Sequence, residues 1–263
     1  MDISYSEIVR FFQEIYNLIK KSSRKLEEPW FLIKNIECLK KFNSYELEDF
    51  LLSFSFIKRE LWNHISINKI KFIIESLKVL NYDITKLSKI LDYQGFEQLI
   101  KEILKLDGYN VITNYRFSDH SYYKYKTSQE RYEIDVMGLK ENFLLIIDAK
   151  QWNKRDLFSS LNKAANLQFR RIIALHNNEE KLNNLVIKLF KSNNNVKKYL
   201  PLKLIPMIIT LEESSFKTNN SRIPLVSIYK FNSFLQELKE NIQYFKYIEI
   251  KKVILQKRLI NKN

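Results

Sequence analysis

The chain has 263 residues, 45% hydrophobic and 14% aromatic, so it can bury a substantial core and is not a disordered tail. Its 44 Lys and Arg against 30 Asp and Glu give a net charge of +14, which favours a polyanionic partner such as nucleic acid. Only three glycines and one cysteine occur, which excludes a glycine-rich phosphate loop, an internal disulfide and a cysteine-based metal cluster.

Residues 1–90 are predicted to be helical throughout and to form an N-terminal all-helical domain. Apolar residues recur at helical spacing from Ile8 to Ile19, and the same spacing continues from Tyr45 to Phe54 and from Ile65 to Leu80. These helices have apolar faces but no diagnostic turn. Three roles are therefore open for this domain. It reads DNA as a helix-turn-helix, it dimerises, or it binds another protein.

The pattern changes near residue 92, and a second domain is predicted over residues 91–245. It begins with a helix that Gly108 can end in the left-handed conformation. The elements predicted after it are strands at 109–115, 132–139 and 142–150, helices at 155–175 and 179–191, strands at 202–211 and 224–229, and a helix at 231–245. This order predicts an α/β (α+β) fold in which helices flank a mixed β-sheet.

Residues 246–263 form a basic C-terminal segment, with six Lys and Arg against one Glu. Two interpretations are open for it. The segment is either an arm that contacts nucleic acid or a last amphipathic strand with a frayed tail.

Two neighbouring predicted strands carry charged residues where phosphodiester chemistry would need them. Side chains alternate faces along a strand, so Asp148 and Lys150 share one face, as do Glu133 and Asp135. If the strands pair as a hairpin, carboxylates and an amine converge at one end of the sheet. Carboxylate oxygens are ligands of Mg²⁺ or Mn²⁺, and such an ion activates water and neutralises phosphate charge. Lys150 would stabilise developing negative charge or orient the attacking water.

A plainer interpretation is that a charged pair marks the point where a buried strand meets solvent. The second acidic strand, the positive net charge and the order of elements favour the metal site over this alternative. The sequence therefore predicts a catalytic centre formed by Asp135, Asp148 and Lys150.

The same residues carry a resemblance to a known family. Glu97 on a helix, Asp135 on a strand and Asp148-Ala149-Lys150 on the next strand resemble the PD-(D/E)XK (restriction-endonuclease-like) nuclease superfamily. Its αβββαβ core matches the predicted order over residues 94–211. The phrases GFEQLIKEILKLDGYNV and YEIDVMG, with LLIIDAKQW, look most like the Mrr-like and archaeal Holliday-junction-resolvase branches.

The resemblance implies roles for these residues. Asp135 and Asp148 would be metal ligands, Lys150 the catalytic lysine, Glu97 an accessory metal-binding acid and the Ala149 carbonyl a backbone ligand. The sequence departs from the pattern at Ile134, which replaces the proline of the family name, and residues 1–90 have no counterpart in the core.

Further residues are weaker candidates, each with a packing or surface role as its alternative. Gln151 and Gln168 are candidates for contacting substrate or the attacking water. The candidates for contacts to nucleic-acid phosphates are Lys154, Arg155, Lys163, Arg170 and Arg171. A tyrosine-rich segment could stack on unpaired bases through Tyr122, Tyr123 and Tyr125. Structural roles are expected for His64, His120, His176 and Trp152.

The sequence thus predicts a metal-dependent endonuclease that hydrolyses DNA, of restriction or repair type, with Mg²⁺ or Mn²⁺ as cofactor. The alternatives are a Holliday-junction resolvase, a catalytically inactive nucleic-acid-binding protein of the same fold, and a protein-interaction module. A homodimer is expected because a double-strand break by a single-site nuclease needs two active sites. The lone Cys38 and the lack of a membrane-spanning run favour a cytoplasmic setting without membrane contact.

Overall fold

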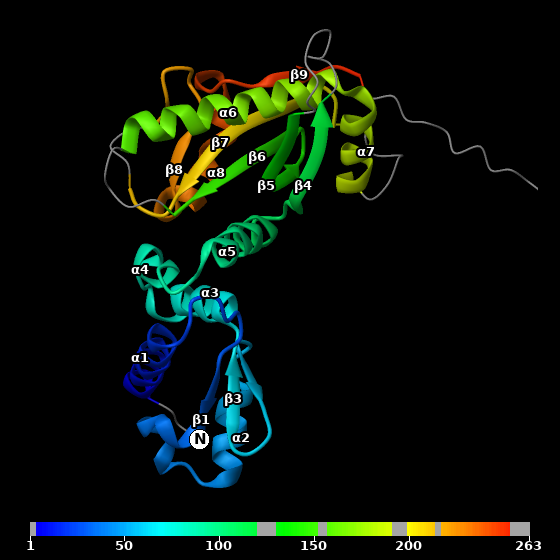
Figure 1. Cartoon of the computed structure of the whole chain (residues 1–263). Helices are drawn as coiled ribbons and strands as arrows, with labels where there is room; N and C mark the ends of the chain where they lie inside the picture. Colours follow the sequence, from blue (N-terminus) through cyan, green and yellow to red (C-terminus); the bar gives the residue numbers. More distant parts are fainter. Residues whose placement is uncertain (1–3, 120–129, 152–156, 191–198, 214–216, 253–263) are drawn as a thin grey trace, which may run out of the picture. The chain divides into compact units, whose positions relative to one another are not determined.

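The computed structural model describes residues 4–119, 130–151, 157–190, 199–213 and 217–252. The chain divides into two compact units, Met1–Leu99 and Ile100–Asn263, and each is described by itself (Figure 1). In the described residues, no helix combines the length and the apolar character that crossing a membrane would require.

The first unit combines helices with a small antiparallel sheet. Its elements are α1 (Tyr5–Lys21), β1 (Trp30–Leu32), η1 (Ile33–Asn35), η2 (Glu37–Lys41), α2 (Ser44–Leu52), β2 (Ile57–Arg59), β3 (His64–Ile67), α3 (Lys69–Leu80) and α4 (Ile84–Ser88). Within the described part of this unit the strand order is β1-β3-β2, and both pairings are antiparallel.

The prediction that residues 1–90 are helical throughout is therefore wrong. The three strands have only three or four residues each, too few to show an alternating pattern against the helical periodicity around them. Their pairing also depends on partners far apart in the chain, such as Trp30 opposite Ser66. Such a partner is not visible in a local window of sequence.

Phenylalanine rings fill the core of the first unit. Ser4 and Glu7 form a capping box that begins α1, and this helix buries Phe11 and Phe12 completely. The Phe11 ring packs edge-on against Phe50 of α2, with 4.9 Å between ring centroids. The apolar stripe of α1 thus packs against α2.

The second unit contains a mixed sheet between helices. Its elements, with α5 running in from the first unit, are α5 (Tyr93–Leu106), β4 (Asn110–Asp119), β5 (Glu130–Lys140), β6 (Phe143–Lys150), α6 (Leu157–Asn177), α7 (Glu179–Phe190), β7 (Leu202–Thr210), β8 (Leu225–Ser227), η4 (Ile228–Lys230), α8 (Phe231–Asn241), η5 (Ile242–Tyr244) and β9 (Ile248–Ile250). Within the described residues the sheet has the order β4-β5-β6-β7-β8, and β9 pairs with β7. The predicted mixed sheet flanked by helices is confirmed.

Strand direction changes in the middle of this sheet. The pairs β4–β5 and β5–β6 are antiparallel, whereas β6–β7 and β7–β8 are parallel. β6 is therefore an interior strand, and Phe143–Ala149 are all buried, as the continuous apolar run FLLII requires.

Helix α6 lies along one face of the sheet, as Figure 1 shows. Its residues Ile172 and Leu175 belong to the same core cluster as Leu144 and Ile146 of β6. Because alternate residues of a strand share a face, Asp148 and Lys150 continue the row that begins with Leu144 and Ile146. The fold thus brings α6 to the face that carries the predicted catalytic residues.

The C-terminal segment contributes β9, which lies antiparallel to β7. This observation favours the strand interpretation for its first part. Residues 253–263 lie outside the described residues.

The hairpin between β2 and β3 carries a strained residue at its tip. Trp62 and Asn63 both have left-handed backbone conformations, with φ of 52° and 56°. The His64 N–H donates to the Leu61 carbonyl at 3.2 Å, which closes the turn. Two positive φ values suit Asn and Gly well and a bulky residue poorly. Trp62 is nevertheless 84% exposed, so its side chain gains little from burial.

We predict that Trp62→Asn raises the free energy of unfolding by about 1 kcal/mol, because Asn tolerates the left-handed conformation. Urea and thermal unfolding of the full chain, followed by circular dichroism, measure this change. Trp30→Asn is the matched control, since Trp30 is 57% exposed on the regular strand β1 and should show no gain. A less stable Trp62→Asn variant would contradict the prediction.

Candidate active site

The candidate site lies where β5 separates from β6. The β5–β6 ladder ends at the pair Val136 and Ile147, so Asp135 is the first residue of β5 beyond it. On the other side, β4 pairs with β5 through Thr113–Val136 and Tyr115–Ile134. Asn114, between these pairs, has a left-handed φ of 53°. Regular pairing is thus interrupted on both sides of Asp135.

The Asp135 carboxylate replaces a strand carbonyl as a hydrogen-bond acceptor. Its Oδ2 accepts a hydrogen bond of 2.9 Å from the backbone N–H of Ala149. Asp135 is only 7% exposed, so this bond satisfies an amide that water would not readily reach. The bond fixes Asp135 beside the Asp148-Ala149-Lys150 segment, as the predicted hairpin required.

The Asp148 carboxylate is almost fully buried and is held by two cations. Lys150 Nζ lies 2.9 Å from Oδ2, and Arg171 Nη1 lies 2.7 Å from Oδ1. The side chain of Asp148 is 3% exposed, against 19% for Lys150 and 15% for Arg171. Each oxygen of this carboxylate therefore has its own positively charged partner, one from β6 and one from α6.

Gln168 connects the helix, the strand and the guanidinium. Its Nε2 donates to the Ile146 carbonyl at 2.9 Å, and its Oε1 accepts from Arg171 Nη1 at 2.8 Å. Gln168 is fully buried, and its donor and acceptor ends have different partners, which fixes the orientation of the amide. One turn of α6 thus places both Gln168 and Arg171 at Asp148.

The donor set suits a hard cation. Asp135 and Asp148 supply carboxylate oxygens on adjoining strands, and the Ala149 carbonyl is a further oxygen close to them in the chain. Among the residues that the structure describes, no group of three or more His, Cys, Asp or Glu is placed to hold a metal. An ion held here would keep several water ligands, which fits Mg²⁺ or Mn²⁺ better than Zn²⁺.

The other predicted acids lie apart from this arrangement or stay predictions. Glu133 forms an ion pair with Arg116 of β4 at 2.9 Å, and its side chain is 44% exposed. Glu97 is 4% exposed on α5, on the N-terminal side of the boundary between the units. Its role as an accessory acid stays a prediction.

The weaker candidates divide by position. Gln151 is partly buried directly after β6, and Lys163 and Arg170 are exposed on α6. Contacts of these residues with nucleic acid stay predictions. The candidates outside the described residues are His120, Tyr122, Tyr123, Tyr125, Trp152, Lys154 and Arg155. The two described histidines lie near neighbouring residues, His64 Nδ1 at 3.2 Å from the Leu61 carbonyl and His176 Nδ1 at 3.4 Å from Asn177.

The sequence did not indicate that Arg171 pairs with Asp148. Arg171 is paired with a carboxylate of the site, and its predicted contact with phosphate stays a prediction. The available signal was the spacing of Gln168 and Arg171, which places them one helical turn apart on the same face of α6.

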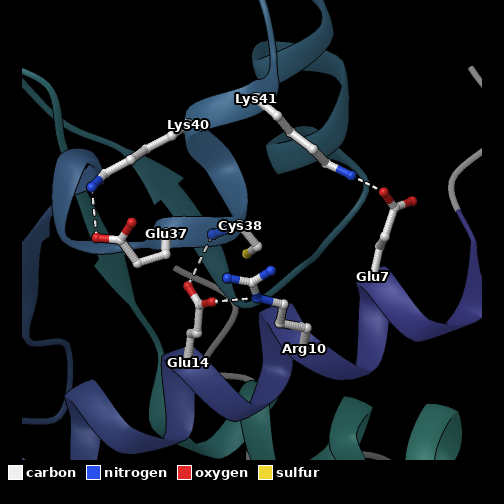
Figure 2. Close-up of polar contacts among 7 residues, drawn as sticks. All are labelled: Glu7, Arg10, Glu14, Glu37, Cys38, Lys40 and Lys41. Atoms are coloured by element: carbon white, nitrogen blue, oxygen red, sulfur yellow. Dashed lines mark hydrogen bonds and ion pairs between the residues drawn. The ribbon is translucent and has the colours of Figure 1, made fainter.

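A second polar cluster lies in the first unit, around Cys38 (Figure 2). Its ion pairs are Arg10–Glu14 at 3.0 Å, Lys40–Glu37 at 2.6 Å and Lys41–Glu7. The Cys38 N–H donates to the Glu14 carboxylate at 3.1 Å. Burial, and then the negative charge and hydrogen bond of Glu14, raise the pKa of the Cys38 thiol to about 12. At neutral pH the thiol stays protonated, which does not suit a nucleophile or a metal ligand.

Comparison with known proteins gives one family match. The nuclease-related domain (NERD) matches residues 93–254, a range that contains Asp135, Asp148, Lys150, Gln168 and Arg171. A search of curated proteins finds no match. Among solved structures, the chain is similar to protein VC1899 from Vibrio cholerae, with a TM-score of 0.32 and 13% identity. The similarity covers 91% of this chain and 53% of that one, so the chain spans about half of its length.

We predict that Asp135→Ala lowers the free energy of unfolding by about 1–3 kcal/mol, because the buried Ala149 amide loses its acceptor. Asp135→Asn keeps an acceptor oxygen and should cost clearly less. Urea unfolding in EDTA measures both values without any contribution from metal. Glu133→Ala is the control on the same strand, and its exposed ion pair should be worth about 1 kcal/mol or less. Equal stability of the Ala and Asn variants would exclude a structural role for this hydrogen bond.

Proposed function

The chain belongs to the nuclease-related domain family, a PD-(D/E)XK-like nuclease family, and we propose that it is a metal-dependent endonuclease hydrolysing DNA phosphodiester bonds. One observation carries this proposal. The Asp135 carboxylate is bonded to the amide of Ala149, between Asp148 and Lys150. Two buried carboxylates and an amine from adjoining strands thus lie together within the matched range.

Asp135, Asp148 and the Ala149 carbonyl would hold the divalent ion, with Glu97 as an accessory acid. When bound, the ion supplies an activated water and charge neutralisation at the phosphate. The hydrogen bond from Ala149 limits the motion of Asp135, so this ligand is held in place before the ion arrives.

Lys150 is the proposed catalytic lysine. Its ammonium group lies 2.9 Å from Asp148 and its side chain is 19% exposed, so it is anchored at one side and can reach solvent. In that position it can donate hydrogen bonds to a phosphate oxygen or to the attacking water. Asp148 orients this amine toward the reacting phosphate.

Charge distribution supports nucleic acid as the substrate. Residues 1–99 contain 15 Lys and Arg against 14 Asp and Glu, whereas residues 100–263 contain 29 against 16. Nearly all of the net charge of +14 therefore belongs to the unit that holds Asp135 and Asp148. Phosphate attraction is expected from this unit and not from the first.

The finer assignments rest on this same proposal. We favour a restriction- or repair-type enzyme over a Holliday-junction resolvase because residues 1–90 extend well beyond a minimal nuclease core. We further propose that the chain belongs to the Mrr-like branch and forms a homodimer that cuts both strands. A cytoplasmic setting, which agrees with a single protonated thiol, completes the proposal. Light scattering tests the dimer.

We predict cleavage of DNA that requires Mg²⁺ or Mn²⁺ and stops in EDTA. Supercoiled plasmid, linear duplex, single strands and a four-way junction should each be incubated with the full chain. Lys150→Met should lower the rate about 100-fold or more, as expected for loss of a group that stabilises the transition state. Asp148→Asn should do the same. Lys140→Met is the matched control and should keep nearly full activity. It removes a lysine of β5 that is paired with Asp107.

The outcomes separate the alternatives. Cutting in EDTA would exclude metal dependence, and preference for the four-way junction would favour a resolvase. Salt-sensitive DNA binding without cutting of any substrate would favour an inactive nucleic-acid-binding protein of the same fold.

A further inference from the structure

Building on the proposed function, we propose that Arg171 is the resident counter-ion of Asp148, which competes with the divalent ion for this carboxylate and thereby sets the metal affinity of the site. The inference concerns the protein before metal binds. It assigns Arg171 as a positioning residue that acts through Asp148, not as a catalytic residue.

Asp148 is already paired with cations without a metal. Each oxygen of its carboxylate has a cation within 2.9 Å, Lys150 on one side and Arg171 on the other. A divalent ion that coordinates Asp148 would have one of these cations as a close neighbour. Like charges at such a distance repel strongly in a site with little water. Metal binding therefore requires one cation to move away or to find an anion.

Arg171 is the cation that can leave. Lys150 is the second residue after Asp148 on the same strand, and its backbone is paired with β7 opposite Thr210. Arg171 comes from α6, and its guanidinium has five N–H donors with which to take up new partners. Its side chain is 15% exposed, so part of the group already reaches solvent, where a phosphate oxygen could accept its hydrogen bonds.

Gln168 holds Arg171 in the competing position. The Gln168 amide is fixed by its hydrogen bond to the Ile146 carbonyl, and its oxygen accepts from the same Nη1 that contacts Asp148. This nitrogen therefore lies between two acceptors, at 2.7 Å and 2.8 Å. These two hydrogen bonds favour the ion pair with Asp148 over other positions of the guanidinium. They therefore strengthen the competition of Arg171 with the metal ion for Asp148.

The test is a titration of the full chain with Mn²⁺ alone, in the absence of nucleic acid, followed by electron paramagnetic resonance of the free ion. Arg171→Gln should bind Mn²⁺ about tenfold more tightly than the wild type or better, because the repelling charge is gone. Arg170→Gln is the matched control. It removes the same charge from the exposed neighbouring residue and should change the affinity less than about twofold.

A second variant keeps the inference testable if Arg171→Gln does not fold. Gln168→Leu keeps every charge but removes the hydrogen bond between Gln168 and Arg171. It should therefore tighten Mn²⁺ binding by a smaller factor than Arg171→Gln. Circular dichroism in EDTA checks that each variant is folded. The inference is overturned if folded Arg171→Gln and Gln168→Leu bind Mn²⁺ no more tightly than the wild type, even where the wild type cuts DNA with metal. If no variant binds Mn²⁺ and the wild type cuts in EDTA, the metal-dependent function fails, and the inference with it.

Discussion

The second unit depends on finding partners for two carboxylates that are buried on adjoining strands, Asp135 and Asp148. A carboxylate that leaves water is costly unless hydrogen bonds or cations replace the solvent. For Asp135 the replacement is a backbone amide of β6, and for Asp148 it is a pair of cations. Because one of these cations is on α6, the helix has to lie where Arg171 reaches the strand. The apolar residues of α6 then cover the same face of the sheet.

Local sequence patterns were enough to predict the central strands, and the period-two alternation of side chains predicted that Asp148 and Lys150 share a face. The run FLLII indicated a buried strand, and the short link after Lys140 indicated a hairpin, which is how β5 and β6 pair. The helices after β6 were likewise predicted from their apolar faces, and α6 and α7 begin and end within two residues of the predicted limits. Local periodicity therefore predicts the elements and their order well.

What periodicity could not predict is the geometry that depends on several elements at once. The left-handed Asn114 beside Asp135 has no signal in the sequence, because Asn occurs in many conformations. The pairing of Arg171 with Asp148 requires knowing which face of α6 meets β6 and how far along the strand it lies. The small sheet of the first unit was missed for the same reason, since its strands gain their identity from distant partners.

The two units differ in net charge. In the first unit, α2 contains Glu46, Glu48 and Asp49 and no basic residue, so phosphates would repel it. Exposed apolar side chains on α2 and on the β2–β3 turn, among them Tyr45, Leu52 and Trp62, are more suited to protein contacts than to phosphate.

The second unit combines an overall positive charge with buried carboxylates at the site, and the two properties act over different distances. A polyanion senses the sum of many surface charges, because it lies along the protein and neutralises several of them together. A single divalent ion mainly senses the charges within about one Debye length, roughly 8 Å at physiological salt. Within that distance Asp148 is paired with Lys150 and Arg171, so a divalent ion would have to displace Arg171, whereas the excess of basic residues over the whole unit can attract nucleic acid. The buried acids would thus offer ligands to the proposed divalent ion once Arg171 moves away, while the basic residues of the same unit would attract an anionic substrate.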